Sequence, residues 1–175
     1  MPVLSDLLHA GLRLVICGTA AGKQSAAMGA YYAGRGNKFW ATLFKVGLTG
    51  DRTLNPSEFA KLISFGIGLT DLAKHVAGND ADLPRGCFDA PRMRNAIEEI
   101  APRALAFSGK KAASVFFGRP TGLIGYGRQV ERLGSTTIHV LPSTSGAASG
   151  QWSIAPWCAL ARELHESGAR SKTSC

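Results

Sequence analysis

The chain has 175 residues, which is enough for one domain with one hydrophobic core and too few for two full domains. Hydrophobic residues make up 45% of the sequence and charged residues 18%, and this composition excludes a chain that is disordered throughout. The formal net charge of +8 favours a polyanionic partner, either nucleic acid or an anionic membrane.

The sequence carries no sign of membrane insertion or of a resident metal. No segment approaches the roughly 20 consecutive apolar residues that a membrane-spanning helix needs. The first residues include Asp6 and lack the early basic residues of a secretory signal, so we expect a cytoplasmic protein without a membrane partner. The four cysteines form no C-x-x-C pair and lie far apart, which disfavours a zinc knuckle, a redox dithiol and an iron–sulfur cluster. We expect no metal and no organic cofactor.

The first half of the sequence predicts strands and helices around a long glycine-rich connection. In chain order the predicted elements are a buried strand at Leu12–Cys17, a connection at Gly18–Gly36, a helix at Lys38–Val46, a second helix that starts at Asn55 and ends before Gly66, and a short strand at Ile67–Leu69. A connection as long as residues 18–36 inside a compact domain usually carries function.

The second half continues the alternation of helices and strands. Its predicted elements are a helix that opens at Pro91, a strand at Ala104–Phe107, a helix that begins at Gly109–Lys111, a strand at Thr137–Leu141 and a final helix at Ser153–Glu166. Such alternation is typical of a parallel sheet covered on both faces. We therefore predict an α/β three-layer sandwich with a short, mainly parallel central sheet, in which residues 1–168 form one domain and residues 169–175 a flexible tail.

In a sheet of this kind the ligand site lies beyond the carboxyl ends of the strands. The loops after Cys17, Leu69, Phe107 and Leu141 are thus expected to meet at one rim. The first of them, G-T-A-A-G-K-Q-S, is not a nucleotide phosphate loop, because Cys17 and Gln24 stand where that motif requires glycine and serine or threonine. No G-x-G-x-x-G follows the strand, which argues against dinucleotide binding.

Four segments spread along the chain together resemble the motifs of a known family. They are D-L-L-H-A-G-L-R-L-V-I-C-G-T-A-A-G from Asp6 to Gly22, Y-A-G-R-G-N-K-F-W from Tyr32 to Trp40, G-I-G-L-T-D-L from Gly66 to Leu72, and L-P-S-T-S-G from Leu141 to Gly146. In order and spacing they resemble the mismatch-specific uracil/thymine DNA glycosylases of the uracil-DNA glycosylase superfamily. The resemblance covers Asp6 to Leu164 and implies a uracil-DNA glycosylase-like fold.

The resemblance implies a pocket that holds a base taken out of the DNA stack. Glycine-rich backbone would offer amides to the base, and the ring of Tyr32 would stack on it. Ser25 matches a small residue beside the 5-position of the base, or it is an ordinary loop serine. The residues expected to bind the base are Gly18, Thr19, Ala20, Gly22, Ser25, Tyr32 and Ser143.

A second set of residues is expected to hold the DNA backbone, since hydroxyls, amides and lysines contact phosphates. These residues are Lys110, Ser143, Thr144, Ser145, Gly146 and Ala147. The family places a larger side chain as a wedge near Ala147 and Ala148, where this chain has only methyl groups. Either Gln151 or Trp152 replaces the wedge, with Trp152 equally suited to anchor the last helix, or the protein prefers single strands and loose mismatches.

The catalytic residue departs from the family pattern. The asparagine that positions the attacking water is replaced by Ala20, which cannot form a hydrogen bond through its side chain. Asp71 is the best substitute, because a carboxylate can accept a proton from water and offset positive charge on the sugar. Alternatively Asp71 caps a following helix, on which His75 could pair with it. By resemblance, the iron–sulfur branch of uracil glycosylases also combines alanine in this motif with an acid elsewhere.

The function expected from this resemblance is hydrolysis of the N-glycosidic bond of uracil in DNA by a monomeric, monofunctional glycosylase. No lysine stands where a Schiff base would form, so no lyase step is expected. His139 is predicted to be a structural residue of its strand. The alternatives are a glycosylase for xanthine or hypoxanthine, with Asp71 paired to the base, and a DNA-binding relative that lost activity with the change at Ala20.

Overall fold

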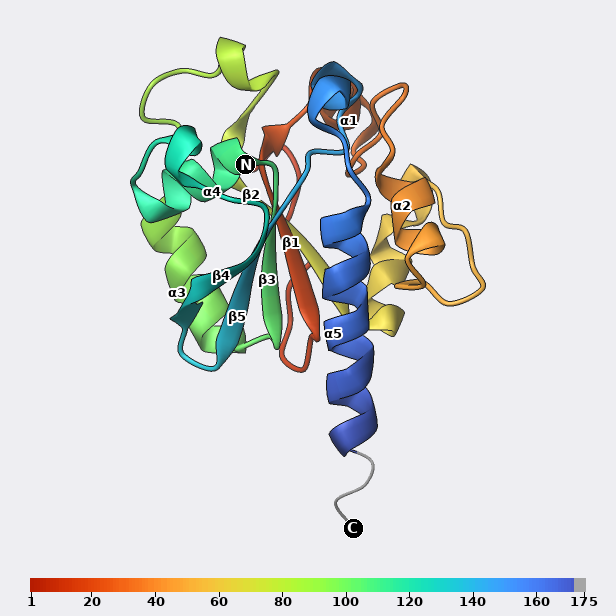
Figure 1. The fold of residues 1–175 in the computed structure, drawn as a ribbon. Coiled ribbons are helices and arrows are strands. Elements are labelled where there is room, and N and C mark those ends of the chain that lie inside the picture. Colours follow the sequence, from red (N-terminus) through yellow and green to blue (C-terminus); the bar gives the residue numbers. More distant parts are fainter. Residues whose placement is uncertain (172–175) are drawn as a thin grey trace.

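The computed structural model describes residues 1–171, which form a five-stranded sheet with helices on both faces (Figure 1). The strands are β1 (Leu14–Ala21), β2 (Ile67–Ala77), β3 (Ala104–Ser108), β4 (Gly127–Leu133) and β5 (Thr136–Leu141), in the order β2-β1-β3-β5-β4. All neighbouring pairs are parallel except β4 and β5, which are antiparallel. The predicted α/β three-layer sandwich with a mainly parallel sheet is confirmed.

Alternate residues of β1 divide the core into two layers, as the two-residue period of a strand requires. Leu14 and Ile16 pack on one side of the sheet, whereas Val15 and Cys17 pack on the other. The first layer contains α2 (Phe39–Lys45), the 3₁₀ helix η1 (Pro56–Phe65) and α5 (Ala155–Ser171). The second contains α3 (Ala90–Ile100) and α4 (Lys110–Phe117). Figure 1 shows α5 and α2 on one side of the strands and α3 and α4 on the other.

Two strands run further than the sequence predicted. β1 continues to Ala21, and the expected loop after it also forms the short helix α1 (Lys23–Met28). β2 continues to Ala77, because the N-terminal residues pair along its outer edge. Val3 N donates to Lys74 O at 2.6 Å, and a bridge joins Leu7 to Leu69. The helix expected after residue 71 does not form, so the helix-capping interpretation of Asp71 is wrong.

The sequence did not reveal β4, because its exposure alternates without an apolar face and only Leu133 is buried. The remaining elements are the 3₁₀ helices η2 (Asp80–Asp82), η3 (Thr121–Leu123) and η4 (Gly146–Gln151). α5 includes residues 169–171 of the predicted C-terminal tail, and residues 172–175 of that tail lie outside the described residues.

Candidate active site

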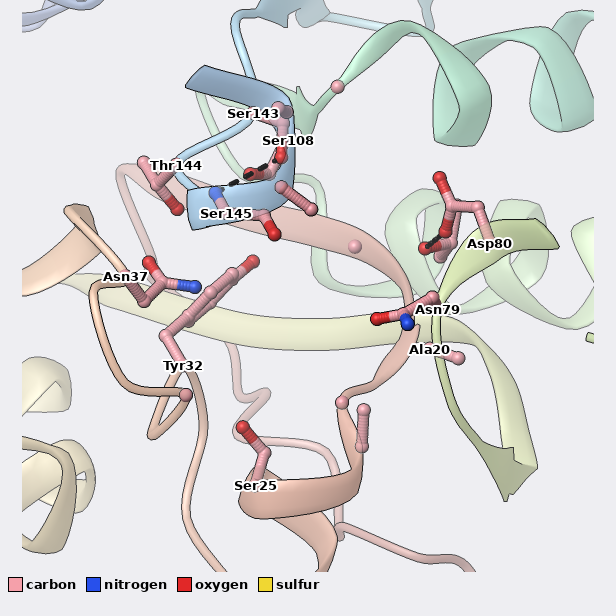
Figure 2. A pocket seen from close by; sticks show the side chains of 18 of the residues that line it. Ala20, Ser25, Tyr32, Asn37, Asn79, Asp80, Ser108, Ser143, Thr144 and Ser145 are labelled. Carbon is pink, nitrogen blue, oxygen red and sulfur yellow. Dashed lines mark hydrogen bonds between the residues drawn. The ribbon is translucent and has the colours of Figure 1, made fainter. Parts of the chain in front are cut away.

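A cavity of about 840 Å³ opens at the carboxyl ends of β1, β3 and β5 (Figure 2). It is lined by the end of β1, α1 and the loop after α1, the start of α4, the loop after β2, and the segment from β5 into η4. The structure places every residue predicted for the site in this wall, and these residues are Gly18, Thr19, Ala20, Gly22, Ser25, Tyr32, Asp71, Lys110, Ser143, Thr144, Ser145, Gly146 and Ala147. The expected meeting at one rim is observed, but the residues after Cys17 and Leu69 contribute to it as continuations of β1 and β2 and not as loops.

Asp71 lies on β2 directly across from Gly18 of β1 and is only 4% exposed. A Cβ atom on Gly18 would come within 2.6 Å of Asp71 Oδ1, so the missing side chain at position 18 gives the carboxyl group its room. Within residues 1–171, the Asp71 carboxyl group has no hydrogen-bond partner, and it lines the cavity. Its oxygens are thus presented to a ligand and do not tie down the backbone.

Burial raises the pKa of Asp71 from an ordinary 3.8 to about 7. The charge of Lys74 lowers this pKa, that of Asp6 raises it and that of Arg92 lowers it. Asp6 forms ion pairs with Lys74 Nζ at 2.7 Å and with Arg92 Nη1 at 2.8 Å. Arg92 Nη2 also donates to the Asp71 backbone carbonyl at 2.7 Å. A carboxyl group with a pKa near 7 can take up and release a proton at neutral pH.

Tyr32 forms an aromatic wall of the cavity. Its φ of 52° lies in the left-handed region, which a bulky side chain rarely adopts. The ring stacks on Phe39 with a centroid separation of 3.7 Å and an interplanar angle of 13°. Because Phe39 is fully buried, it holds the Tyr32 ring as a fixed planar surface at the cavity.

The end of β1 presents backbone groups to the cavity. Pairing between β1 and β3 stops at Cys17 and Phe107, so the β3 side of residues 18–21 has no strand partner. Oriented amides of this kind can stabilise negative charge on a leaving group. Ser25, which is 5% exposed, accepts a hydrogen bond from Ala33 N at 3.0 Å. The Ser25 hydroxyl therefore fixes α1 to the loop that carries Tyr32.

The segment from Ser143 to Ala147 forms the wall opposite α1. Ser143 Oγ accepts a hydrogen bond from Ser145 N at 3.2 Å, and Thr144 O accepts one from Lys38 N at 2.9 Å. The Thr144 side chain is buried, and its hydroxyl has no partner in the described part of the chain. Figure 2 shows this segment across from Tyr32.

Cationic side chains outnumber acids in the cavity wall. Lys23, Arg35, Lys110 and Lys111 line it, against Asp71 and Asp80. Lys110 Nζ lies 4.6 Å from the centroid of the Tyr126 ring, a cation–π contact that holds its charge at the cavity. This excess of positive charge favours an anionic ligand.

Comparison with known proteins identifies the superfamily of this chain. The sequence profile of the Uracil DNA glycosylase superfamily matches residues 6–161. This chain belongs to the uracil DNA glycosylase superfamily. Membership implies a DNA glycosylase of DNA repair with damaged DNA as its substrate, and it does not select the mismatch-specific family within the superfamily.

A solved structure of a superfamily relative has the same architecture. The solution NMR structure of a "putative Uracil DNA glycosylase" from Methanosarcina acetivorans is similar to this chain with a TM-score of 0.60. The two sequences are 20% identical, and the match covers 93% of this chain and 96% of that chain. At this level of identity the likeness concerns the fold.

For this member of the uracil DNA glycosylase superfamily, the structure corrects the expectation for His75 and separates the two wedge candidates. His75 cannot pair with Asp71 on a helix, because both residues lie in the extended strand β2. His75 Nδ1 instead lies 3.2 Å from Met1 O. Of the two wedge candidates, Trp152 packs against the core and Gln151 lines the cavity.

Asn79, Asp80 and Ser108 also line the cavity and were not identified from the sequence. Thr19 Oγ1 donates to Asp80 Oδ1 at 2.5 Å, and Figure 2 shows Asn79 beside Ala20. Residues 79 and 80 could not be placed near the site from the sequence, because the strand that precedes them was predicted to end at Leu69. The turn-forming sequence Gly-Asn-Asp at residues 78–80 could have indicated a loop at this point.

In residues 1–171, no group of three or more His, Cys, Asp or Glu side chains is arranged to hold a metal ion. Cys17, Cys87 and Cys158 are free thiols. No helix in the same part of the chain is long and apolar enough to cross a bilayer.

Proposed function

We propose that this chain is a monofunctional DNA glycosylase of the mismatch-specific uracil/thymine type, which hydrolyses the N-glycosidic bond of uracil in DNA during base-excision repair. The observation that carries the proposal is the Asp71 carboxyl group, which is buried, lines the cavity and has a pKa raised to about 7. A carboxyl group in this state can act as a general base at neutral pH.

Binding begins with extrusion of the uracil nucleotide from the stack into the cavity. The Tyr32 ring stacks on the base, while the backbone of residues 18–22 and the Ser25 region surround its edge. Lys110 and the segment from Ser143 to Ala147 bind phosphates next to the extruded nucleotide and fix its position without reading sequence.

The hydrolytic step uses Asp71 as the base. The Asp71 carboxylate accepts a proton from a water molecule as the water oxygen forms a bond to C1′ of the deoxyribose. The C1′–N1 bond breaks, and its electron pair leaves with the base as a uracil anion, which takes a proton after departure. The negative charge of Asp71 also offsets positive charge that builds on the sugar, and the unpaired backbone edge of β1 stabilises the leaving anion.

Release of uracil from oligonucleotides tests this proposal. Asp71→Asn keeps the size of the side chain and removes its ability to accept a proton, so the single-turnover rate should fall by about a thousandfold. Asp82→Asn is the matched control, because Asp82 lies on η2, is exposed and does not line the cavity. Its rate should equal that of the wild type. Equal rates for Asp71→Asn and the wild type would contradict the proposal.

Substrate form and base range are tested in the same assay. Because Ala147 and Ala148 are small, Trp152 packs against the core and only Gln151 is left at the cavity as a wedge candidate, we expect faster release from single strands than from duplexes. We expect uracil to be released faster than hypoxanthine or xanthine. Release of these purines without uracil would identify a glycosylase for other deaminated bases. DNA binding without any release would identify an inactive relative.

A further inference from the structure

The hydroxyl group of Tyr32 is buried in the cavity wall, where the Ser108 side chain lies close to it but no hydrogen bond of standard geometry forms in the described part of the chain. A buried hydroxyl without a partner costs free energy, and the ring alone would stack on Phe39 equally well as phenylalanine. The weak approach of Ser108 therefore leaves the hydroxyl incompletely satisfied within the fold. Its position beside a cavity points to a partner that enters with the substrate.

Gly18 brings this hydroxyl close to the Asp71 carboxyl group. The position that a Cβ atom would take on Gly18 lies 2.6 Å from Asp71 Oδ1 and 3.6 Å from Tyr32 Oη. Both oxygens thus border the same small space over the Gly18 α-carbon. A water molecule that lies between the two oxygens, further from the Gly18 α-carbon and nearer Tyr32 than this position, can contact both, since hydrogen bonds between oxygens are 2.5–3.0 Å long.

We propose that Tyr32 is a second catalytic residue, whose hydroxyl holds the attacking water jointly with Asp71; this inference rests on the proposed hydrolysis of uracil. The water donates one hydrogen to the Asp71 carboxylate and the other to Tyr32 Oη. Both of its hydrogens are then fixed, and an oxygen lone pair is left for C1′. The Tyr32 ring and its hydroxyl have separate tasks, because the ring face binds the base and the oxygen orients the water.

The surroundings keep the phenol neutral, as this task requires. Burial and the nearby charges of Asp71 and Cys17 raise the pKa of Tyr32 well above its ordinary value, and the approach of Ser108 lowers it only in part. The hydroxyl therefore does not compete with Asp71 for the proton of the water. Asp71 takes up the proton, and Tyr32 contributes only orientation, which matters because a small misplacement of a reacting atom slows a reaction strongly.

The test compares Tyr32→Phe with Tyr32→Leu in single-turnover release of uracil. Tyr32→Phe keeps the ring and should lower the chemical rate by about tenfold to a hundredfold, with DNA affinity unchanged. Tyr32→Leu removes the ring as well and should also weaken substrate binding. Thermal unfolding should show that Tyr32→Phe is about as stable as the wild type, because it loses only a buried hydroxyl that forms no hydrogen bond of standard geometry.

The double variant Tyr32→Phe/Asp71→Asn shows whether the two oxygens act on one water. If they do, it is no slower than Asp71→Asn alone, because the water is already unactivated. Rates that multiply, or a Tyr32→Phe rate equal to that of an active wild type, would overturn this inference and leave the proposed function intact. A wild type that releases no uracil would overturn the proposed function itself.

Discussion

Two strands of the sheet each bury a titratable side chain, Asp71 on β2 and His139 on β5, and their surroundings are opposite. His139 is 1% exposed and has neighbours within the fold, with Glu163 Oε2 at 3.6 Å and Thr137 Oγ1 at 3.3 Å from its Nε2. Asp71 is equally enclosed, but its carboxyl oxygens border the cavity and lack such partners.

Whether a buried titratable side chain has fixed partners distinguishes a structural residue from a reactive one better than the extent of its burial does. Burial moves each pKa against its charged form, upward for Asp71 and downward for His139. His139 is compensated by neighbours that stay in place, as expected of the structural residue that the sequence predicted. The burial of Asp71 is offset only in part by the charges of Lys74 and Arg92, a cost in stability that is expected where a group must react.

The largest expected effect on stability comes from Asp71→Asn. The pKa of Asp71 is about 7 in the fold and 3.8 in an unfolded chain, so between these values the folded state binds more protons. Wild-type stability should therefore fall as the pH rises from 4 to 7. Asp71→Asn lacks this loss and should gain up to about 4 kcal/mol in unfolding free energy at pH 8. Denaturant titrations at pH 4.5 and pH 8 measure this. An equal change in unfolding free energy at both pH values would contradict the raised pKa of Asp71 and the contrast with His139.

His139→Gln should behave in the opposite way. Burial lowers the pKa of His139 below 6.5, and the charge of Glu163 raises it while that of Arg128 lowers it. The unfolded state then binds the proton more readily, so wild-type stability should fall as the pH drops through 6.5. We expect the substitution to cost about 1 to 3 kcal/mol at pH 8 and less at pH 5, with uracil release retained. Loss of release in a folded variant would contradict the structural role.

Asp6→Asn tests, through the pH dependence of catalysis, whether neighbouring charges set the pKa of Asp71. The release rate should rise with pH through about 7, as Asp71 loses its proton. The groups that face Asp71 are Asp6, Lys74, Arg92, Tyr31, Tyr32 and Cys17. Removal of the negative charge of Asp6 should move the midpoint of the profile to lower pH. Lys74→Met should move it to higher pH, and shifts in the same direction for both would contradict this electrostatic account.

The smallest expected effect concerns DNA affinity. Lys110→Ala should weaken binding to a uracil oligonucleotide by about fivefold and reduce the slope of log affinity against log salt by about one. Lys61→Ala is the control, because Lys61 lies on η1 and does not line the cavity. Fluorescence anisotropy at several salt concentrations measures both, and an unchanged slope for Lys110→Ala would remove this residue from the DNA-binding surface.

The apolar strands and the outline of the site could be predicted from the sequence, because buried parallel strands are continuous apolar runs that end in functional loops. The runs that end near Cys17, Phe107 and Leu141 bring their following loops to the observed cavity. α5 is a similar case, since Trp157, Leu160, Ala161 and Leu164 recur at helical spacing and all are buried.

The features that the sequence could not supply depend on distant contacts. β2 extends past Asp71 because residues from the N-terminus pair along it, and no local signal in residues 70–77 indicates that partner. β4 lacks an apolar face, so only its pairing with β5 defines it. The positive φ of Tyr32 and the approach of Asn79 to the cavity likewise follow from packing between segments far apart in the sequence.

The N-terminal pairing along β2 has a practical consequence for preparing the protein. Tyr31 Oη donates to Ser5 O at 3.1 Å, and Asp6 is joined to the cations beside Asp71, so the first residues belong to the electrostatic environment of the reaction. An affinity tag fused before Met1 would disturb the pairing of this segment with β2, and we expect it to change the turnover rate without contacting the cavity. The end of α5, which Figure 1 shows far from the N-terminus, is the better place for a purification handle.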